Sequence, residues 1–157
     1  MTVRFKSTRT ANQSLPVRMV SAAERFFEAA ERCGSRDRAE IHEIGRWLPE
    51  PQIVMFAFAA EVALKGLQQL HNGATSGGHD LVKILGKLPE DVRSQLRLNA
   101  YSEAEFTSLL QEVQHAFKNW RYEYENAEPT IVPPFFLKNL AAAAIAELKK
   151  TVGGNAA

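Results

Sequence analysis

Residues 53–70 constrain the fold more than any other part of the chain, because this long apolar stretch carries only two charged side chains, Glu61 and Lys65. Its apolar residues recur at the three- and four-residue spacing of a helix rather than in the alternation of a strand. The two charges keep the stretch below the roughly 18 apolar residues that a membrane span needs. We therefore predict a central helix over residues 52–70, covered by other helices and preceded by a break at the Pro-Glu-Pro sequence of residues 49–51.

The same helical periodicity extends along nearly the whole chain, and no segment shows the sustained alternation of apolar and polar residues that marks a strand. A chain of 157 residues is long enough for one domain to bury a core without disulfides or metal. We predict an all-α, single-domain bundle of four to five main helices plus short ones. The predicted helices span residues 16–33, 37–47, 52–70, 81–88, 89–98, 102–126 and 135–151.

Capping residues support several of these boundaries. Ser102 lies three residues before Glu105, which predicts a capping box at the start of a helix that runs to residue 126. The His-Asn-Gly sequence at residues 71–73 predicts the end of the central helix, because glycine commonly follows a helix C-terminus. On this prediction the chain divides into a flexible N-terminal arm (1–14), a helical bundle (15–152) and a disordered tail (153–157).

Composition and charge exclude several classes of protein. Apolar residues make up 45% of the chain and charged residues 24%, which is the balance of a soluble globular domain. A formal net charge of +1 is too small for a broad interface with duplex nucleic acid, so any contact with phosphate is expected to be local. The single cysteine allows no internal disulfide, and the basic N-terminus lacks the apolar segment of a secretory signal. We therefore expect a cytoplasmic protein without a membrane partner.

The sequence contains none of the familiar cofactor, metal or hydrolase motifs. His42, His71 and His115 have no zinc-ligand spacing with one another or with Cys33, so neither a metal nor a cofactor is expected. There is no Walker loop, no GxGxxG and no GxSxG. Any site has to be assembled from isolated polar residues on different helices.

The Glu61–Lys65 pair is the first candidate, and it allows two interpretations. The residues lie four apart, so they can form an ion pair on a solvated helix face that contributes a few tenths of a kcal/mol, roughly. The surrounding helix has little other polar surface, however. A mostly buried helix with one acid and one base favours a further partner for both.

His79 and Asp80 follow two glycines and precede an apolar helix. Asp80 is suited to be the N-cap of that helix, where its carboxylate would accept a backbone N–H. Capping does not explain the histidine. Its side chain can stay exposed, pack over a core edge, or reach a site as a donor or proton carrier.

The sequence FKNWRYEYE at residues 117–125 places an arginine among aromatic residues. Arg121 shares a helix face with aromatic neighbours three and four residues away. As a purely structural residue, Arg121 can pair with Glu125 or stack on Tyr124 or Trp120. A buried guanidinium needs acceptors for five N–H donors, and Glu61 on another helix or a bound phosphate would supply them.

Three stretches, FAAEVALKGL, GGHDLVKIL and FKNWRYEYE, follow one another on successive predicted helices. In this order they resemble the prokaryotic HEPN superfamily of small helical domains, over about residues 53–126. The resemblance implies a bundle of four or five helices that forms a homodimer with a polar cleft near the dimer axis. It also implies RNA or a nucleotide as ligand, and a nucleotidyltransferase or an antitoxin as protein partner.

Many members of that superfamily are ribonucleases that use an arginine followed, after four to six intervening residues, by a histidine. Arg121 matches the arginine, but Asn126, Ala127 and Glu128 stand where the histidine is expected. The resemblance therefore implies first a non-catalytic module that binds RNA or nucleotide phosphate in a defence or toxin-antitoxin system. The residues expected to bind the ligand are Glu61, Lys65, Asp80, Tyr122, Tyr124 and Glu125, with His79 and Arg121 as the candidates for catalysis.

Three alternatives stay open at this stage. In the first, the chain is a metal-independent ribonuclease in which His79 is the general acid or base and Arg121 stabilises the pentacoordinate phosphate. In the second, the apolar face of residues 135–148 binds another protein and the domain is a scaffold. In the third, the charged residues satisfy one another in a buried network that offers no ligand site.

Overall fold

The structure, a computed structural model, describes residues 14–34, 49–97, 100–116 and 133–154. This part of the chain contains six helices and no strand, which confirms the predicted all-α bundle. The predicted helix at residues 37–47 lies outside it. The helices are α1 (Leu15–Gly34), α2 (Pro49–Asn72), α3 (Leu81–Gly86), α4 (Glu90–Leu96), α5 (Glu103–Val113) and α7 (Pro134–Gly154).

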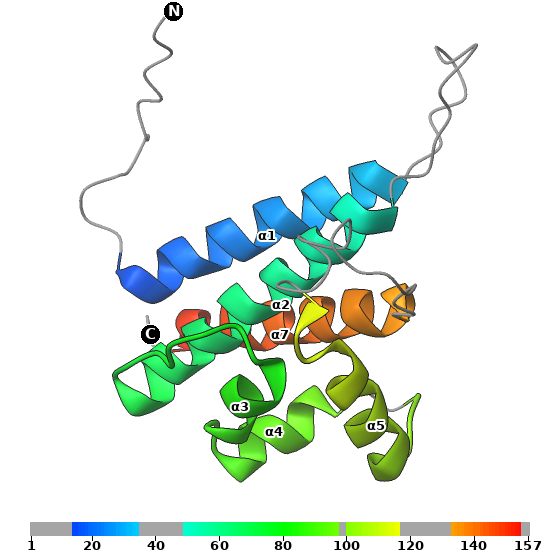
Figure 1. Cartoon of the computed structure of the whole chain (residues 1–157). Helices are drawn as coiled ribbons and strands as arrows, with labels where there is room; N and C mark the ends of the chain where they lie inside the picture. The colour runs from blue at the N-terminus through cyan, green and yellow to red at the C-terminus, as the bar shows by residue number, and fades with distance from the viewer. Residues whose placement is uncertain (1–13, 35–48, 98–99, 117–132, 155–157) are drawn as a thin grey trace, which may run out of the picture.

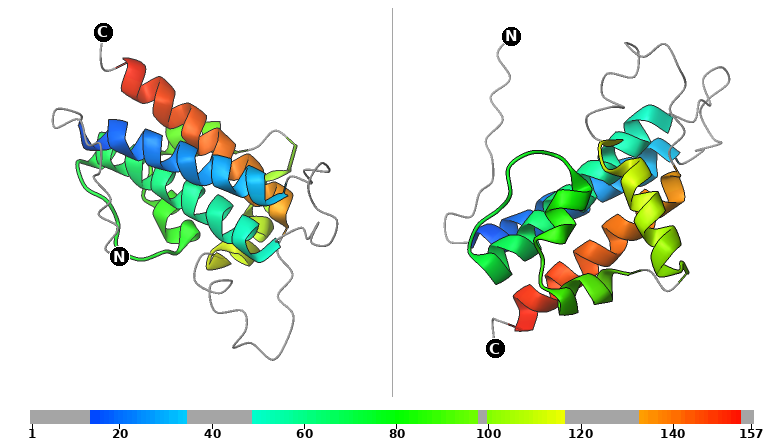
Figure 2. Two further views of the ribbon diagram at one scale, coloured as in Figure 1. Left: turned by 90° about the horizontal axis from the view of Figure 1, so that it is seen from above. Right: turned by 60° about the horizontal axis from the view of Figure 1, so that its bottom comes forward.

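The three long helices pack against one another, and the three short helices lie beneath α2 and α7 (Figure 1). α1 is antiparallel to α2, whereas α7 runs in the same direction as α2 and contacts both (Figure 2). Of the short helices, α3 packs on α2, α4 packs on α7, and α5 packs on α3. α2 is therefore covered by α1, α3 and α7.

This enclosure explains the apolar composition of α2. Among the residues that the structure describes, Glu61 and Gln68 are the only buried polar ones, and both belong to α2. By length and hydropathy α2 would suit a membrane span, but 61% of its apolar window is buried inside the bundle, as in the core helix of a soluble protein. The buried apolar residues of α2 are Ile53, Phe56, Ala57, Ala59, Ala60, Ala63, Leu64 and Leu67.

Small residues allow α2 and α7 to approach closely. A Cβ added to Gly66 would lie 2.6 Å from Cδ2 of Leu148, a side chain that is itself fully buried. Ala141 and Ala144 of α7 are also fully buried. Because these side chains are small, the backbones of the two helices lie close together. The interface is thereby packed as densely as a protein interior.

Aromatic residues of α1 pack onto α2. The ring of Phe26 meets that of Phe58 with centroids 4.4 Å apart, and Phe27 meets Phe56 at 5.2 Å, both edge to face. Ala30 is fully buried on the same face. Edge-to-face pairs of this kind are favoured by the ring quadrupoles and add to the burial of apolar surface.

A second aromatic cluster joins α5 to α7. Phe136 is 1% exposed, and its ring packs edge to face against Phe106 at 5.4 Å and Tyr101 at 5.6 Å between centroids. Leu110 and Val113, one and two turns beyond Phe106 on α5, are buried beside it. These three residues form the core face of α5.

The ends of α2 and α7 differ from the prediction. α2 begins at Pro49, so the Pro-Glu-Pro sequence forms its first turn instead of a break before it. Proline is tolerated there because the first N–H groups of a helix have no intrahelical acceptor. α2 ends at Asn72, where Gly73 takes a left-handed φ of 72° and confirms the predicted stop. α7 continues to Gly154, beyond the end expected near Thr151.

α5 starts as predicted and ends earlier. The capping box is present, with the Ser102 hydroxyl and the Glu105 carboxylate bonded to each other's backbone N–H. Hydrogen bonds from the side chain and then the backbone of Ser102 lower the pKa of Glu105. The prediction of an unbroken helix to residue 126 is wrong, because α5 ends at Val113. The carbonyl of Gln114 instead accepts a hydrogen bond from the backbone N–H of Leu81, at 3.0 Å.

Candidate functional site

The candidate site is built on one polar face of α2, which holds the loop between α2 and α3. Glu61, Lys65, Gln68, Gln69 and Asn72 recur on α2 at spacings that place them along one side of a helix. Lys65 Nζ donates to the carbonyl of Gly78 at 2.7 Å, and Gln69 Nε2 donates to the carbonyl of Gly73 at 2.9 Å. Asn72 Nδ2 reaches the carbonyl of Lys87 at 2.9 Å. The loop is thus fixed to α2 near both of its ends.

Gln68 connects the middle of the loop to α3. Its side chain is 1% exposed, and its Nε2 donates to the carbonyl of Ile84 at 2.6 Å. Its Oε1 accepts from the backbone N–H of Ser76 at 2.7 Å and from the Ser76 hydroxyl at 2.9 Å. A buried amide that uses both its donor and its acceptor specifies one loop conformation, because any other would leave a buried polar group unpaired.

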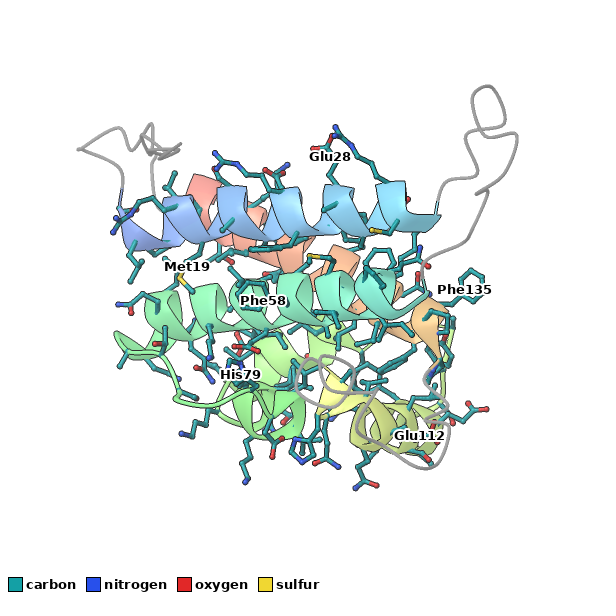
Figure 3. The ribbon with its side chains drawn as sticks, turned by 45° about the horizontal axis from the view of Figure 1, so that its top comes forward. Met19, Glu28, Phe58, His79, Glu112 and Phe135 are labelled. Carbon is teal, nitrogen blue, oxygen red and sulfur yellow. The ribbon has the colours of Figure 1, made fainter. Side chains whose placement is uncertain are left out.

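The loop presents His79 to α2. Gly78, just before the histidine, has a left-handed φ of 81°, which a residue with a Cβ adopts only with strain. Figure 3 shows the His79 side chain between the loop and α2. The glycine and the Lys65 bond to its carbonyl together set the direction in which His79 leaves the backbone.

Glu61 joins His79 and Lys65 in one cluster. His79 Nδ1 lies 3.0 Å from Oε1 and 2.9 Å from Oε2 of Glu61, and Lys65 Nζ lies 2.8 Å from Oε1. The Glu61 side chain is 3% exposed, that of Lys65 17% and that of His79 46%. The cluster therefore has a buried carboxylate at its base and a half-exposed imidazole at its surface.

This burial decides between the two interpretations of the Glu61–Lys65 pair. The residues are paired at a spacing of four, as predicted, but they do not lie on a solvated face. A buried carboxylate is tolerated only when it is paired and hydrogen-bonded. Here the lysine and the histidine supply both kinds of interaction.

The geometry suits the imidazole for proton transfer or for binding an anion. A carboxylate at Nδ1 favours the tautomer with the proton on that nitrogen, in which Nε2 carries no proton. Neutral His79 would then present Nε2 as a base, and protonated His79 would present it as an N–H donor. The Glu61 contact also orients the ring, as the partner of a general-base histidine does.

Asp80 caps α3. Its carboxylate accepts from the backbone N–H of Lys83 at 3.0 Å and lies 3.4 Å from Lys83 Nζ, which confirms the capping interpretation. Burial acts to raise the pKa of Asp80, but the hydrogen bonds from Lys83 and the charges of Lys83 and His115 lower it below the ordinary 3.8. Asp80 therefore stays ionised as a structural cap next to the site.

Replacing Asp80 by alanine should reduce the free energy of unfolding by about 1 kcal/mol at pH 7, the usual effect of losing an N-cap. The folded-state pKa lies below 3.8, so the difference from wild type should hold above that pH and shrink as the pH falls through the folded-state value. Urea unfolding between pH 3 and pH 7 measures it. Asp80→Asn keeps a capping oxygen without the charge and should cost less, and a pH-independent difference for Asp80→Ala would contradict the assignment.

His115, for which the sequence predicts no role in metal binding, lies near the site. Because Gln114 accepts from Leu81, the backbone at residue 115 lies beside the start of α3, where the charge of His115 acts on Asp80. The sequence carries no signal for this proximity, since residues 80 and 115 are far apart in the chain and only the fold brings them together. In the part of the chain that is described, no group of three or more His, Cys, Asp or Glu side chains could hold a metal.

The structure brings together three of the predicted site residues, Glu61, Lys65 and His79, with Asp80 adjacent to them. The remaining ones, Arg121, Tyr122, Tyr124 and Glu125, lie outside the described residues. Whether the arginine reaches the imidazole stays a prediction.

Comparison with known proteins places the chain in no group. No protein-family model matches it, and neither a curated protein nor a solved structure matches it significantly. The resemblance to HEPN domains thus depends on the three sequence stretches quoted above, and a function can be inferred only from the geometry of the cluster.

Proposed function

We propose that this protein is a HEPN-like helical module that binds the phosphate group of RNA or of a nucleotide at the Glu61–Lys65–His79 cluster. The observation that carries the proposal is the buried carboxylate of Glu61 at 2.9 Å from Nδ1 of the half-exposed His79. A carboxylate at one ring nitrogen orients the imidazole, and the 46% exposure of the His79 side chain leaves part of it accessible to a ligand.

The charges of the cluster support an anionic ligand. Glu61 and Lys65 carry opposite charges and compensate each other at 2.8 Å. A proton on His79 would therefore give the cluster a net positive charge, and a bound phosphate would favour that proton. Lys65 already donates to Glu61 and to the carbonyl of Gly78, so its main contribution is to hold the loop and to add charge nearby.

A phosphate titration followed by NMR tests the proposal. At pH 6.5 we expect inorganic phosphate to shift the imidazole signals of His79 saturably. The signals of His71, exposed in the last turn of α2, should not move. His79→Gln should weaken binding of a short single-stranded RNA about tenfold, the loss of one charge-assisted hydrogen bond. The matched variant His71→Gln should bind as the wild type does, and equal effects of the two substitutions would refute the site.

RNA cleavage is the second candidate, because a carboxylate-oriented imidazole is also the arrangement of a general base. His79 Nε2 would take the proton of the 2′-hydroxyl as its oxygen forms a bond to phosphorus and the bond to the 5′-oxygen breaks. The leaving oxygen would receive its proton from water or a second group. RNA cleavage that survives His79→Ala would exclude this candidate and leave the binding proposal in place.

The same proposal includes a cytoplasmic homodimer that acts with a nucleotidyltransferase or an antitoxin. The homodimer and its protein partners are supported by the sequence resemblance alone, and the cytoplasmic location by the single cysteine. Sedimentation at several concentrations distinguishes a dimer from a monomer that awaits another protein.

A further inference from the structure

The loop between α2 and α3 contains two consecutive exposed glycines, Gly77 and Gly78, directly before His79. Within the described part of the chain, no group accepts a hydrogen bond from the backbone N–H of either glycine. A Cβ added to either residue would meet no atom within 4 Å, so the space beside both glycines is open. Two backbone donors next to the imidazole are therefore accessible to a ligand.

The neighbouring contacts fix this stretch of backbone. The N–H of Ser76, just before the glycines, donates to Gln68 Oε1 at 2.7 Å, and the carbonyl of Gly78 accepts from Lys65 Nζ at 2.7 Å. Gly78 has the left-handed φ of 81° noted above. Successive N–H groups in a turn can form a concave site for an anion. Donors that are already held in place cost little conformational entropy when a ligand binds.

The charges around the two glycines suit an anion as well. Lys65 compensates Glu61 at 2.8 Å, and Lys83 Nζ lies 3.4 Å from the capping carboxylate of Asp80. Each nearby carboxylate is thus paired with a lysine. A proton on His79, whose side chain is 46% exposed, adds positive charge beside the N–H groups.

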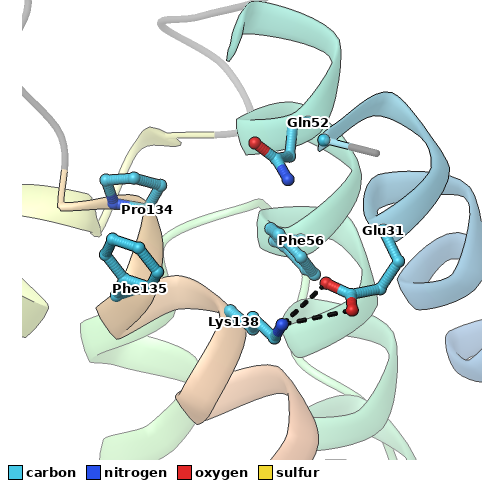
Figure 4. Close-up of a pocket in the computed structure, with 7 residues that line it drawn as sticks. Glu31, Gln52, Phe56, Pro134, Phe135 and Lys138 are labelled. Carbon is cyan, nitrogen blue, oxygen red and sulfur yellow. Dashed lines mark hydrogen bonds and ion pairs between the residues drawn. The ribbon is translucent and has the colours of Figure 1, made fainter. Parts of the chain in front are cut away.

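A cavity of about 390 Å³ at the end of the bundle where α1 ends and where α2 and α7 begin differs in this respect. Its polar lining groups are already engaged: Lys138 Nζ lies 2.9 Å from Oε1 of Glu31, and Gln52 also has a partner of its own (Figure 4). The rings of Phe56 and Phe135 line the same cavity. The loop, in contrast, combines unused donors with a group that can carry a positive charge.

We propose that the Glu61–Lys65–His79 cluster prefers a terminal phosphate group, such as that of a nucleotide or of an RNA end, over an internal phosphodiester. The preference rests on the proposed function, because it requires that phosphate binds at His79. A terminal phosphate carries a charge of about −1.5 to −2 at pH 7 and three strong acceptor oxygens. Two of these oxygens would accept from the N–H groups of Gly77 and Gly78, and the third would lie at the protonated imidazole. A phosphodiester has only two such oxygens and a single negative charge, so one of the three donors would lack an anionic acceptor.

Adenosine 5′-monophosphate (AMP) and its methyl ester test the proposal, because they share the base and the sugar and differ only in whether the phosphate is terminal. In NMR titrations of the full chain at pH 6.5 we expect AMP to shift the amide signals of Gly77 and Gly78 saturably, together with the ring signals of His79. The amide signal of Gly73, at the other end of the loop, should not move. AMP should bind at least about tenfold more tightly than the methyl ester, the effect of one charge-assisted hydrogen bond.

Gly78→Ala and Gly73→Ala are matched substitutions for the same test. Both glycines have a left-handed φ, 81° and 72°, and open space for a methyl group. Alanine should therefore strain the backbone similarly at either position. Gly78→Ala should weaken AMP binding at least about tenfold, because the altered backbone no longer presents its N–H groups beside His79. Gly73→Ala should bind AMP within about twofold of the wild type.

The outcomes separate this preference from the proposed function. Equal affinity for AMP and the methyl ester, or unmoved amide signals of Gly77 and Gly78 at saturation, would overturn the preference, whereas a shift of His79 would still support the phosphate site. No saturable shift of any of these signals would refute both. Equal weakening by Gly78→Ala and Gly73→Ala would overturn the role of the two N–H groups. The comparison of the two ligands uses the wild-type protein, so it remains decisive even if a variant fails to fold.

Discussion

Replacing Glu61 by alanine should lower the free energy of unfolding by about 3 kcal/mol or more, measured by urea denaturation at pH 7. The carboxylate is 3% exposed and binds both Lys65 and His79. Its removal leaves Lys65, whose side chain is 17% exposed, without its anion, and an uncompensated charge in a largely buried side chain is costly. The His79 ring would lose its orientation at the same time, so loop stability and ligand binding should fall together.

The exposed pair Glu28–Arg32 provides the matched control for this prediction. It has the same four-residue spacing as Glu61–Lys65, but its side chains are 62% and 77% exposed. Glu28→Ala should therefore change the free energy of unfolding by no more than about 0.5 kcal/mol. A double replacement, Glu61→Leu with Lys65→Met, should be more stable than Glu61→Ala, because it removes both charges. If Glu61→Ala and Glu28→Ala lowered the free energy of unfolding equally, burial would not increase the contribution of the Glu61–Lys65 pair to stability.

Replacing Phe136 by alanine should lower the free energy of unfolding by about 3–5 kcal/mol, the range for a buried aromatic residue. Phe136 is 1% exposed and packs against Phe106 and Tyr101, so the substitution opens a cavity between α5 and α7. Urea denaturation should show a lower midpoint with an unchanged slope, as expected for a change in stability alone.

The neighbouring residue is the control for the Phe136 prediction. Phe135 precedes it on α7 and is 75% exposed, so Phe135→Ala should change the free energy of unfolding by about 0.5 kcal/mol or less. A large loss of stability at Phe136 and a small one at Phe135 would verify which face of α7 is directed into the core. Similar losses at both positions would mean that α7 is turned differently about its axis.

The sequence was sufficient for the fold class because helical periodicity and caps are local signals. The central helix predicted over residues 52–70 and the capping box of Ser102 and Glu105 depend on residues three and four positions apart. The end of α5 was not predictable in this way. It is accompanied by a hydrogen bond between Gln114 and Leu81, which are distant in the sequence.

The candidate site could be predicted only as a set of residues. The sequence pointed to Glu61, Lys65 and His79, but whether the Glu61–Lys65 pair is exposed or buried depends on how α1, α3 and α7 cover α2. The loop contacts of Gln68 and Ser76 gave no signal, since glutamine and serine are ordinary on a helix face and in a loop. The part of the site expected from Arg121 lies outside the described residues and stays a prediction.

α2 is one unbroken helix, so it fixes the distance between Gln52 near its start and Glu61 at the polar cluster. Gln52 at the cavity and Glu61 at the polar cluster are separated by a helix rise of about 14 Å. This spacing cannot shorten while α2 remains folded. A ligand held at the cluster reaches the cavity only if it spans that length by itself, and a shorter one leaves the cavity untouched.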